Sequence, residues 1–202
     1  MNNIYRRLPH FLLCASILSG CAATTMKSTW QDPSYSFTAM KSVLIIGVSQ
    51  KDLVKRTLED QFVAQLATRG IKATSSYQVL PPGAVPDEAS LAAFVHDKGI
   101  SAILVTRLTD RRTEEQYIPP TQTTTLTAPM GYYGYYQDSR QLVTTTTPGY
   151  TSTQSYASLE TRIFDSATGK PVWIGSSETL LSDNIEKLVK GYVRLIVKKM
   201  LN

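Results

Sequence analysis

The chain has 202 residues, of which 21 are basic and 16 are acidic, and its formal net charge is +5. This length is enough for one domain with a hydrophobic core. No block of basic residues stands out, which argues against nucleic acid as a partner. With only two histidines and two cysteines, the composition also argues against a zinc site.

A secretory signal is predicted at the N-terminus. Arg6 and Arg7 precede an apolar run over residues 8–18, and two small residues follow it. This is the pattern of a cleavable signal peptide. The run has roughly half the length that a membrane-spanning helix needs. Loss of residues 1–20 would leave 182 residues with a net charge of +3.

Leu18-Ser19-Gly20-Cys21 resembles the bacterial lipobox, in which the cysteine is acylated and becomes the first residue of the mature chain. Each buried methylene contributes about 0.8 kcal/mol, so more than one acyl chain holds a protein stably on a bilayer. The alternative is an ordinary secretion signal that is cut near a cysteine. Ala22 stands where an aspartate would favour retention in the inner membrane. We therefore expect palmitate on Cys21 and an outer-membrane lipoprotein facing the periplasm.

Polar residues 22–41 predict a tether between the lipid and the folded domain. Trp30 lies within this stretch and is interpreted as a plug at the edge of the core, with a surface aromatic for a partner as the alternative. The predicted organisation is a signal peptide at 1–20, a lipidated N-terminus and tether at 21–41, and a single periplasmic α/β domain at 42–202.

The first half of the domain alternates strands and helices. An apolar run at 42–49 predicts the central strand, and Val54, Leu58, Phe62 and Leu66 form the buried stripe of a helix over 51–69. Arg56, Glu59 and Asp60 are placed on its outer side, with Ser49 or Asp52 as its cap. Further elements follow as a strand at 71–79 with Ala73, Tyr77 and Val79 inward, a helix at 87–98 and a strand at 100–108. This order favours parallel neighbouring strands joined by helical crossovers. His96, in the second helix, is interpreted as a solvated or capping residue rather than a ligand or base.

A segment rich in Thr and Tyr, residues 119–155, interrupts the domain. Threonine favours strands and the Gly-Tyr cluster favours a flexible tip. We expect two Thr-rich strands, loosely paired, that project from the sheet as an arm, and a disordered loop is the alternative. Tyrosine supplies contact area at low entropic cost. The candidate partner-binding residues are therefore Tyr132, Tyr133, Tyr135, Tyr136 and Tyr150.

The last part of the chain predicts a β-hairpin and a helix. A strand at 156–164 is followed by a turn at 165–170, in which Gly169 supplies a positive φ, and by a returning strand from Pro171. Ser182 or Asp183 is expected to cap the final helix. Its broad apolar stripe predicts a helix that is packed on the sheet, and a helix lying on a membrane is the alternative. The fold class is thus α/β (α+β) with a mixed sheet.

No catalytic motif is evident. A single glycine, Gly47, follows the first strand where a phosphate-binding loop would need several. There is no Gly-x-Ser-x-Gly elbow, and no thiol stays free to act as a nucleophile once Cys14 is removed and Cys21 is acylated. We expect a non-enzymatic protein without catalytic residues, metal or cofactor.

Several short motifs resemble a family. They are Trp30-x-Asp32-Pro33, the strand at 43–48, Arg56-x-x-Glu59-Asp60, Ser76-Tyr77, and Asp165-x-x-Thr168-Gly169-Lys170-x-Val172-Trp173. Together they resemble a group of small uncharacterised proteobacterial lipoproteins. The architecture also resembles the N-terminal domain of TolB and the lipoproteins LpoB and CsgG. This resemblance implies periplasmic protein binding without catalysis, and only the lipidated Cys21 carries over as a functional residue.

Three functions are compatible with these patterns. The first is binding or assembly of a cell-envelope protein partner through strand edges or the Tyr-rich arm. The second is a structural component that self-associates into a homo-oligomer, because Thr-rich edges can add strands to one another. The third is a binder of peptidoglycan or another glycan, with tyrosines stacking on sugars.

The lipobox predicts a specific defect. Cys21→Ser should abolish acylation and leave the protein uncleaved or mislocalised, because lipid attachment and cleavage both depend on that thiol. Palmitate labelling of cells, followed by membrane fractionation, measures both effects. Label on the serine variant, together with its recovery in outer membranes, would contradict the lipobox.

Overall fold

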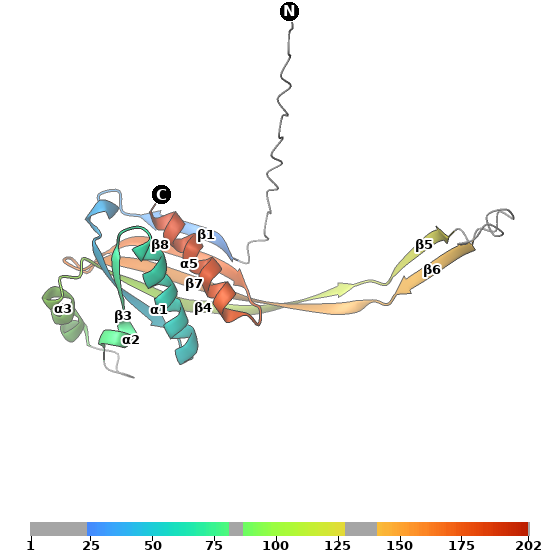
Figure 1. Cartoon of the computed structure of the whole chain (residues 1–202), viewed down its shortest axis with the longest axis horizontal. Coiled ribbons are helices and arrows are strands. Elements are labelled where there is room, and N and C mark those ends of the chain that lie inside the picture. Colours follow the sequence, from blue (N-terminus) through green and yellow to red (C-terminus); the bar gives the residue numbers. More distant parts are fainter. Residues whose placement is uncertain (1–23, 81–86, 128–140, 202) are drawn as a thin grey trace, which may run out of the picture.

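The computed structural model describes residues 24–80, 87–127 and 141–201, and it contains a mixed β-sheet that continues into a long projecting arm (Figure 1). The six strands of the sheet lie in the order β1-β8-β7-β4-β2-β3. Their bounds are β1 Thr24–Gln31, β2 Ser42–Val48, β3 Lys72–Ser75, β4 Ala102–Ile118, β7 Tyr150–Asp165 and β8 Pro171–Leu180. A separate two-stranded sheet joins β5 (Thr121–Thr127) to β6 (Gln141–Thr147).

The helices connect and cover these strands. They are the 3-10 helix η1 (Phe37–Ala39), α1 (Asp52–Ala67), α2 (Ser76–Val79), α3 (Glu88–Asp97) and α5 (Ile185–Met200). β2 is parallel to β3 and to β4, while β4, β7, β8 and β1 are antiparallel to their neighbours. The predicted α/β (α+β) fold with a mixed sheet is thereby confirmed.

The hydrophobic core lies between one face of the sheet and the two helices α1 and α5. Ile45, Leu104, Ile163 and Trp173 come from four different strands, and none is more than 1% exposed. Phe62 of α1 and Tyr192 of α5 meet edge to face above them, with ring centroids 6.3 Å apart. Three of the four residues predicted for the buried stripe of α1 are buried.

A smaller cluster occupies part of the opposite face. Leu44 of β2, Val95 of α3 and Ile100 are buried together, and Ile46 and Ile103 pack against them. α3 therefore covers β2 and the adjoining part of β4. The interior position of β2, apolar on both faces, agrees with the expectation of a covered strand. The middle of the sheet, however, is formed by β4 and β7.

Glu59 lies in the core, although the helical pattern placed it on the outer side of α1. Its side chain is 0% exposed. The backbone N–H of Gly47 (2.9 Å) and the hydroxyl of Ser76 (2.7 Å) donate to Oε1, and the N–H of Tyr77 (3.1 Å) donates to Oε2. Three donors thus replace the water that the carboxylate loses.

The same contacts explain why the predicted strand over 71–79 is wrong in its second half. β3 ends at Ser75, and α2 begins at Ser76 because the carboxylate of Glu59 accepts hydrogen bonds at the first turn of α2. Tyr77 is consequently turned away from the core, and its hydroxyl donates to Asp60 (2.7 Å). Val79 is 38% exposed, while Ala73 packs against the core as expected.

The N-terminal part of the expected tether is an edge strand. β1 pairs antiparallel with β8 from Thr24↔Thr179 to Gln31↔Trp173. The hydroxyls of Thr24 and Thr179 share a buried hydrogen bond of 2.9 Å. Trp30 is 48% exposed, so its interpretation as a core plug is also wrong. Its neighbour across the strand pair is Ile174, which lies on the sheet face away from α1 and α5.

The C-terminal elements are close to the expectation. β7 and β8 form the predicted hairpin, and Gly169 has a φ of +66° in its turn. α5 is packed on the sheet, with Tyr192, Val193 and Ile196 each at most 2% exposed. Its cap is Asn184, whose side chain accepts from the N–H of Lys187, rather than Ser182 or Asp183. The position before α1 is likewise Lys51 rather than Ser49 or Asp52.

A row of hydroxyl groups lies under α5 on the arm side of the core. Thr106 and Thr161 share a hydrogen bond of 2.8 Å, and Thr161 shares another of 2.5 Å with the hydroxyl of Tyr192. Burial raises the pKa of Tyr192 to about 12, against the opposing effect of hydrogen bonds with Thr161, Thr106 and Ser177. The ring therefore stays neutral at physiological pH.

The contribution of Glu59 to stability can be tested by substitution. Glu59→Ala should lower the free energy of unfolding by about 3 to 5 kcal/mol, because it leaves two N–H groups and one hydroxyl without an acceptor and opens a cavity. Asp60→Ala on the exposed side of the same helix is the matched control and should cost about 1 kcal/mol. Urea denaturation followed by circular dichroism measures both. Equal losses would contradict a special role for Glu59.

Candidate functional site: the projecting arm

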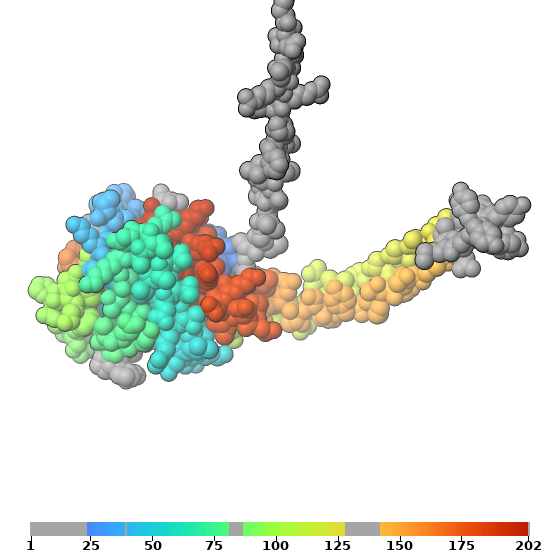
Figure 2. All heavy atoms as spheres, in the orientation of Figure 1, coloured from blue at the N-terminus to red at the C-terminus, as the bar shows by residue number. Residues whose placement is uncertain are grey.

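The arm is a continuation of the two middle strands of the sheet. β4 and β7 are paired from Ala102↔Asp165 to Ile118↔Tyr150, whereas β2 accompanies β4 only to Arg107 and β8 accompanies β7 only from Tyr156. Beyond that point the two strands run alone. We call residues 113–127 and 141–155 the arm, and Figure 2 shows its described part standing clear of the helices.

A joint divides the arm. Pro119-Pro120 and Pro148-Gly149 separate the β4–β7 part from the β5–β6 part. At Gly149 a Cβ atom would lie 2.6 Å from the hydroxyl of Tyr117 and 3.0 Å from the carbonyl oxygen of Ile118. Only glycine therefore fits without displacement of Tyr117. The β5–β6 ladder resumes at Thr121↔Thr147 and ends at Thr127↔Gln141.

No described side chain of the arm is buried. Large apolar side chains are exposed along it, and they are Tyr117 (65%), Leu126 (54%), Leu142 (69%), Val143 (46%) and Tyr150 (58%). Leu126 and Leu142 face each other across the strand pair. Glu114 and Glu115, near its base, are the only charged residues in the described arm. The arm thus offers apolar and hydroxyl groups with little charge.

The edges of the arm differ from the edges of the sheet. β1 carries a bulge between Met26 and Ser28, and Lys27 forms an ion pair with Glu178 (2.7 Å). β3, at the opposite edge, has four residues. Bulges, lysines and short strands are devices that prevent strand addition. Within the described residues, β5 and β6 have no such device over seven residues each.

The site residues predicted from the sequence fall into two groups. Cys21, Tyr132, Tyr133, Tyr135 and Tyr136 lie outside the described residues. Tyr150 is the first residue of β7 and pairs with Ile118 at the joint. The predicted Thr-rich strands are confirmed as β5 and β6. Residues 150–155 of the segment 119–155 belong to β7, and residues 113–118 of β4 form the inner part of the arm together with them.

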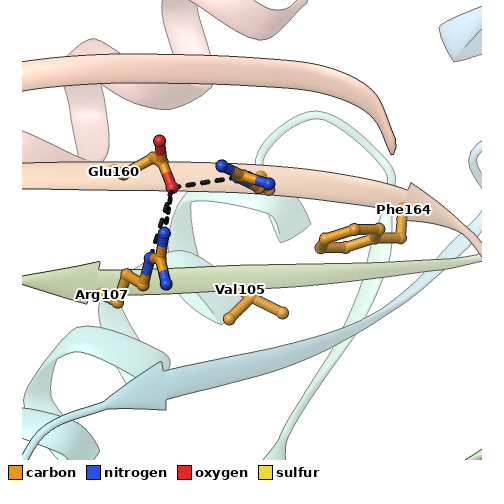
Figure 3. Close-up of a pocket in the computed structure, with 5 residues that line it drawn as sticks. Val105, Arg107, Glu160 and Phe164 are labelled. Atoms are coloured by element: carbon orange, nitrogen blue, oxygen red, sulfur yellow. Dashed lines mark hydrogen bonds and ion pairs between the residues drawn. The ribbon is translucent and has the colours of Figure 1, made fainter. Parts of the chain in front are cut away.

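A shallow hollow lies on the sheet face that α3 leaves uncovered (Figure 3). Arg107 and Arg162 both donate to Oε1 of Glu160 at 3.0 Å, and Val105 and Phe164 line the rest. The hydrogen bond from Arg162, followed by that from Arg107, holds the pKa of Glu160 below its usual range. Both arginines of this hollow are thus paired with Glu160, and nothing there defines a ligand.

The described part of the chain shows no metal site and no membrane-spanning helix. No group of three or more His, Cys, Asp and Glu residues there is arranged to hold a metal ion. None of the helices within those ranges has the length and apolarity of a membrane span. His96 is exposed near the end of α3, as expected for a solvated residue.

No protein-family model matches the sequence, and no curated protein is significantly similar to it. Among solved structures, a PelC dodecamer from Paraburkholderia phytofirmans is 9% identical, with a TM-score of 0.47 over 86% of this chain and 96% of that chain. Lipoprotein GNA1162 from Neisseria meningitidis is 16% identical, with a TM-score of 0.43 over 79% of this chain and 96% of that chain. Because these TM-scores are below 0.5, the similarities define neither a family nor a function.

The exposure of the arm predicts that it contributes little to stability. Residues 119–149 can be replaced by an Asn-Gly turn, because Ile118 and Tyr150 are paired neighbours and this turn suits a two-residue hairpin. The melting temperature of this short-arm variant should stay within a few degrees of the wild type. We call the sheet and helices without the arm the body. Leu104→Ala, which truncates a buried side chain of the body, is the comparison and should lower the free energy of unfolding by about 2 to 5 kcal/mol. A short-arm variant that is destabilised as strongly as Leu104→Ala would place the arm in the folding unit.

Proposed function

We propose that this chain is a non-enzymatic lipoprotein, anchored through Cys21 to the periplasmic side of the outer membrane, whose arm binds a protein of the cell envelope. The observation that carries the proposal is the arm, which is an ordered strand pair with no buried side chain among its described residues.

The energetics of such an arm point to a partner. Each ordered residue loses about 1 to 2 kcal/mol of backbone conformational entropy. In the body, burial of apolar side chains offsets this loss, but the arm has no core to bury them in. A two-stranded ribbon is only marginally stable by itself. An interaction surface outside the chain accounts for why the arm keeps exposed tyrosines and leucines.

The chemistry of the arm indicates how it would bind. Strand edges without charge can accept an added strand through backbone hydrogen bonds, and side chains on alternate positions then set the specificity. Tyr117 and Tyr150 lie at the joint, and Leu126 and Leu142 lie further out. Tyrosine is enriched at interfaces, where its ring gives contact area and its hydroxyl finds a partner.

Self-association is a second candidate, and the uncharged edges of β5 and β6 favour it. Seven consecutive residue pairs join these strands, and four of the pairs, from Thr121↔Thr147 to Thr124↔Thr144, consist of Thr with Thr or Gln. An identical arm would present the same uncharged edge. In this case the envelope partner is another copy of the chain, and gel filtration of the purified protein would show an oligomer that the short-arm variant lacks.

Site-specific photo-crosslinking in living cells tests the proposal. A photoreactive amino acid at Leu126 or Tyr117 should give an adduct with a distinct envelope protein, and the same group at His96 on α3 should give none. The short-arm variant, labelled at Tyr117, should lose the adduct while keeping its membrane localisation.

The possible outcomes separate the candidates. An adduct with the mass of two identical chains supports self-association. Adducts from His96 but not from the arm would contradict both candidates. Binding to purified sacculi that survives removal of residues 119–149 would instead place a glycan site on the body.

A further inference from the structure

The outer surface of α5 carries four basic side chains in one line. Lys187, Lys190, Arg194 and Lys198 recur at intervals of three and four residues, so they share one face of the helix. We call this set the basic stripe. All four residues are exposed, while Tyr192 and Val193 on the opposite face are buried.

The net positive charge of the chain without residues 1–20 comes from this helix. α5 contains five basic residues and one acidic residue, Glu186, a net charge of +4. The chain without residues 1–20 has a net charge of +3. The rest of the mature chain is therefore close to neutral, with a slight excess of acid.

Several cations elsewhere on the protein form ion pairs with carboxylates, and those of the basic stripe do not. Glu160 binds Arg107 and Arg162. Glu178 binds Lys27 and Arg112, and these contacts, that with Lys27 first, hold the pKa of Glu178 below its usual range. In the described part of the chain no side chain of the basic stripe has an ion-pair partner. An anionic partner outside the chain would supply the missing counter-charge for these four side chains.

The position of the stripe relative to Cys21 indicates which anionic partner is within reach. β1 begins at Thr24, three residues after Cys21, and three residues span at most about 11 Å. Thr24 pairs with Thr179, and α5 starts shortly after β8 ends at Leu180. Figure 1 accordingly shows the beginnings of β1 and α5 at the same end of the sheet. A lipid on Cys21 would hold this end of the body against the bilayer surface.

We infer that the basic stripe of α5 lies against the anionic phospholipid headgroups of the membrane that holds the lipid anchor. The inference rests on the proposed acylation of Cys21. Insertion of the helix is not part of it, because the apolar face of α5 is already buried in the core. The stripe contributes charge alone, so the contact depends on anionic lipid and weakens with salt. The anchor supplies the affinity, and the stripe fixes which side of the body faces the membrane.

Lysine footprinting on the full lipidated protein tests the inference. The protein is reconstituted into vesicles of phosphatidylcholine alone or mixed with phosphatidylglycerol, treated with a water-soluble acetylating reagent and analysed by mass spectrometry. Lys187, Lys190 and Lys198 should react roughly threefold more slowly in the anionic vesicles, and high salt should restore their reactivity. Lys72 on β3 and Lys98 after α3 should react equally in both.

Two charge reversals make the test specific. Arg194→Glu within the stripe should restore the reactivity of Lys190 and Lys198 in anionic vesicles. Arg69→Glu, a charge reversal at an exposed residue just after α1, should leave them protected.

The mass of the purified protein separates failure of the anchor from failure of the inference. A protein without acyl groups overturns both the proposed anchor and the membrane contact. An acylated protein whose stripe lysines react equally in both kinds of vesicle overturns the contact alone and leaves the lipoprotein and its arm untouched.

Discussion

The buried carboxylate of Glu59 joins three segments that are distant in the sequence. It sits on α1 and accepts hydrogen bonds from the end of β2 and from the beginning of α2. Transfer of an unpaired charge into the core would cost several kcal/mol, and the three donors together offset this. The alternative orientation, with Glu59 in water, would leave the N–H of Gly47 without this acceptor. The hydrogen bonds of Glu59 therefore hold α1, the end of β2 and the beginning of α2 in fixed relative positions.

Gly47 is part of the same arrangement. A Cβ atom there would lie 3.3 Å from Leu58 and 3.5 Å from Glu59. The absence of a side chain lets α1 approach β2 closely enough for the hydrogen bond to form. Arg56 and Asp60 complete the cluster, since the guanidinium lies 5.2 Å from the ring centroid of Tyr77 and the carboxylate accepts from its hydroxyl. The motif residues of α1 and α2 thus contribute contacts that hold the fold together.

The sequence predicts most of the fold because its strands and helices carry apolar patterns of the right period. β2, α1, α3, the body part of β4 and α5 all follow such patterns. β1 does not, because it is a polar edge strand with a bulge at Lys27 that breaks the alternation of side chains. Glu59 could not be placed either, because its donors come from Gly47 and from residues 76–77, and their approach depends on the tertiary structure.

The arm was only partly predictable for a related reason. Its outer strands follow from the β propensity of threonine, but the continuity of β4 and β7 into it has no apolar signal. The charged residues after Leu108 end the hydrophobic pattern, yet the backbone ladder continues to Ile118. Cross-strand contacts support it locally, since Arg112 lies 4.5 Å from the ring centroid of Tyr156 and Thr113 shares a hydrogen bond with Ser155. Such pairs stabilise a ladder without any core.

The continuity of β4 and β7 from the sheet into the arm determines the direction in which the arm projects. At about 3.3 Å per residue, the stretch from the bulge after Leu108 to Thr127 has a length of roughly 60 Å. Because β4 and β7 are also the middle strands of the sheet, the direction of the inner arm is set by the packed core and not by a flexible linker. Beyond the bulge after Leu108, the joint at Pro119-Pro120 is the first place where the ladder is interrupted. With so few residues between Cys21 and β1, any surface that orients the body against the membrane also decides where the outer arm lies.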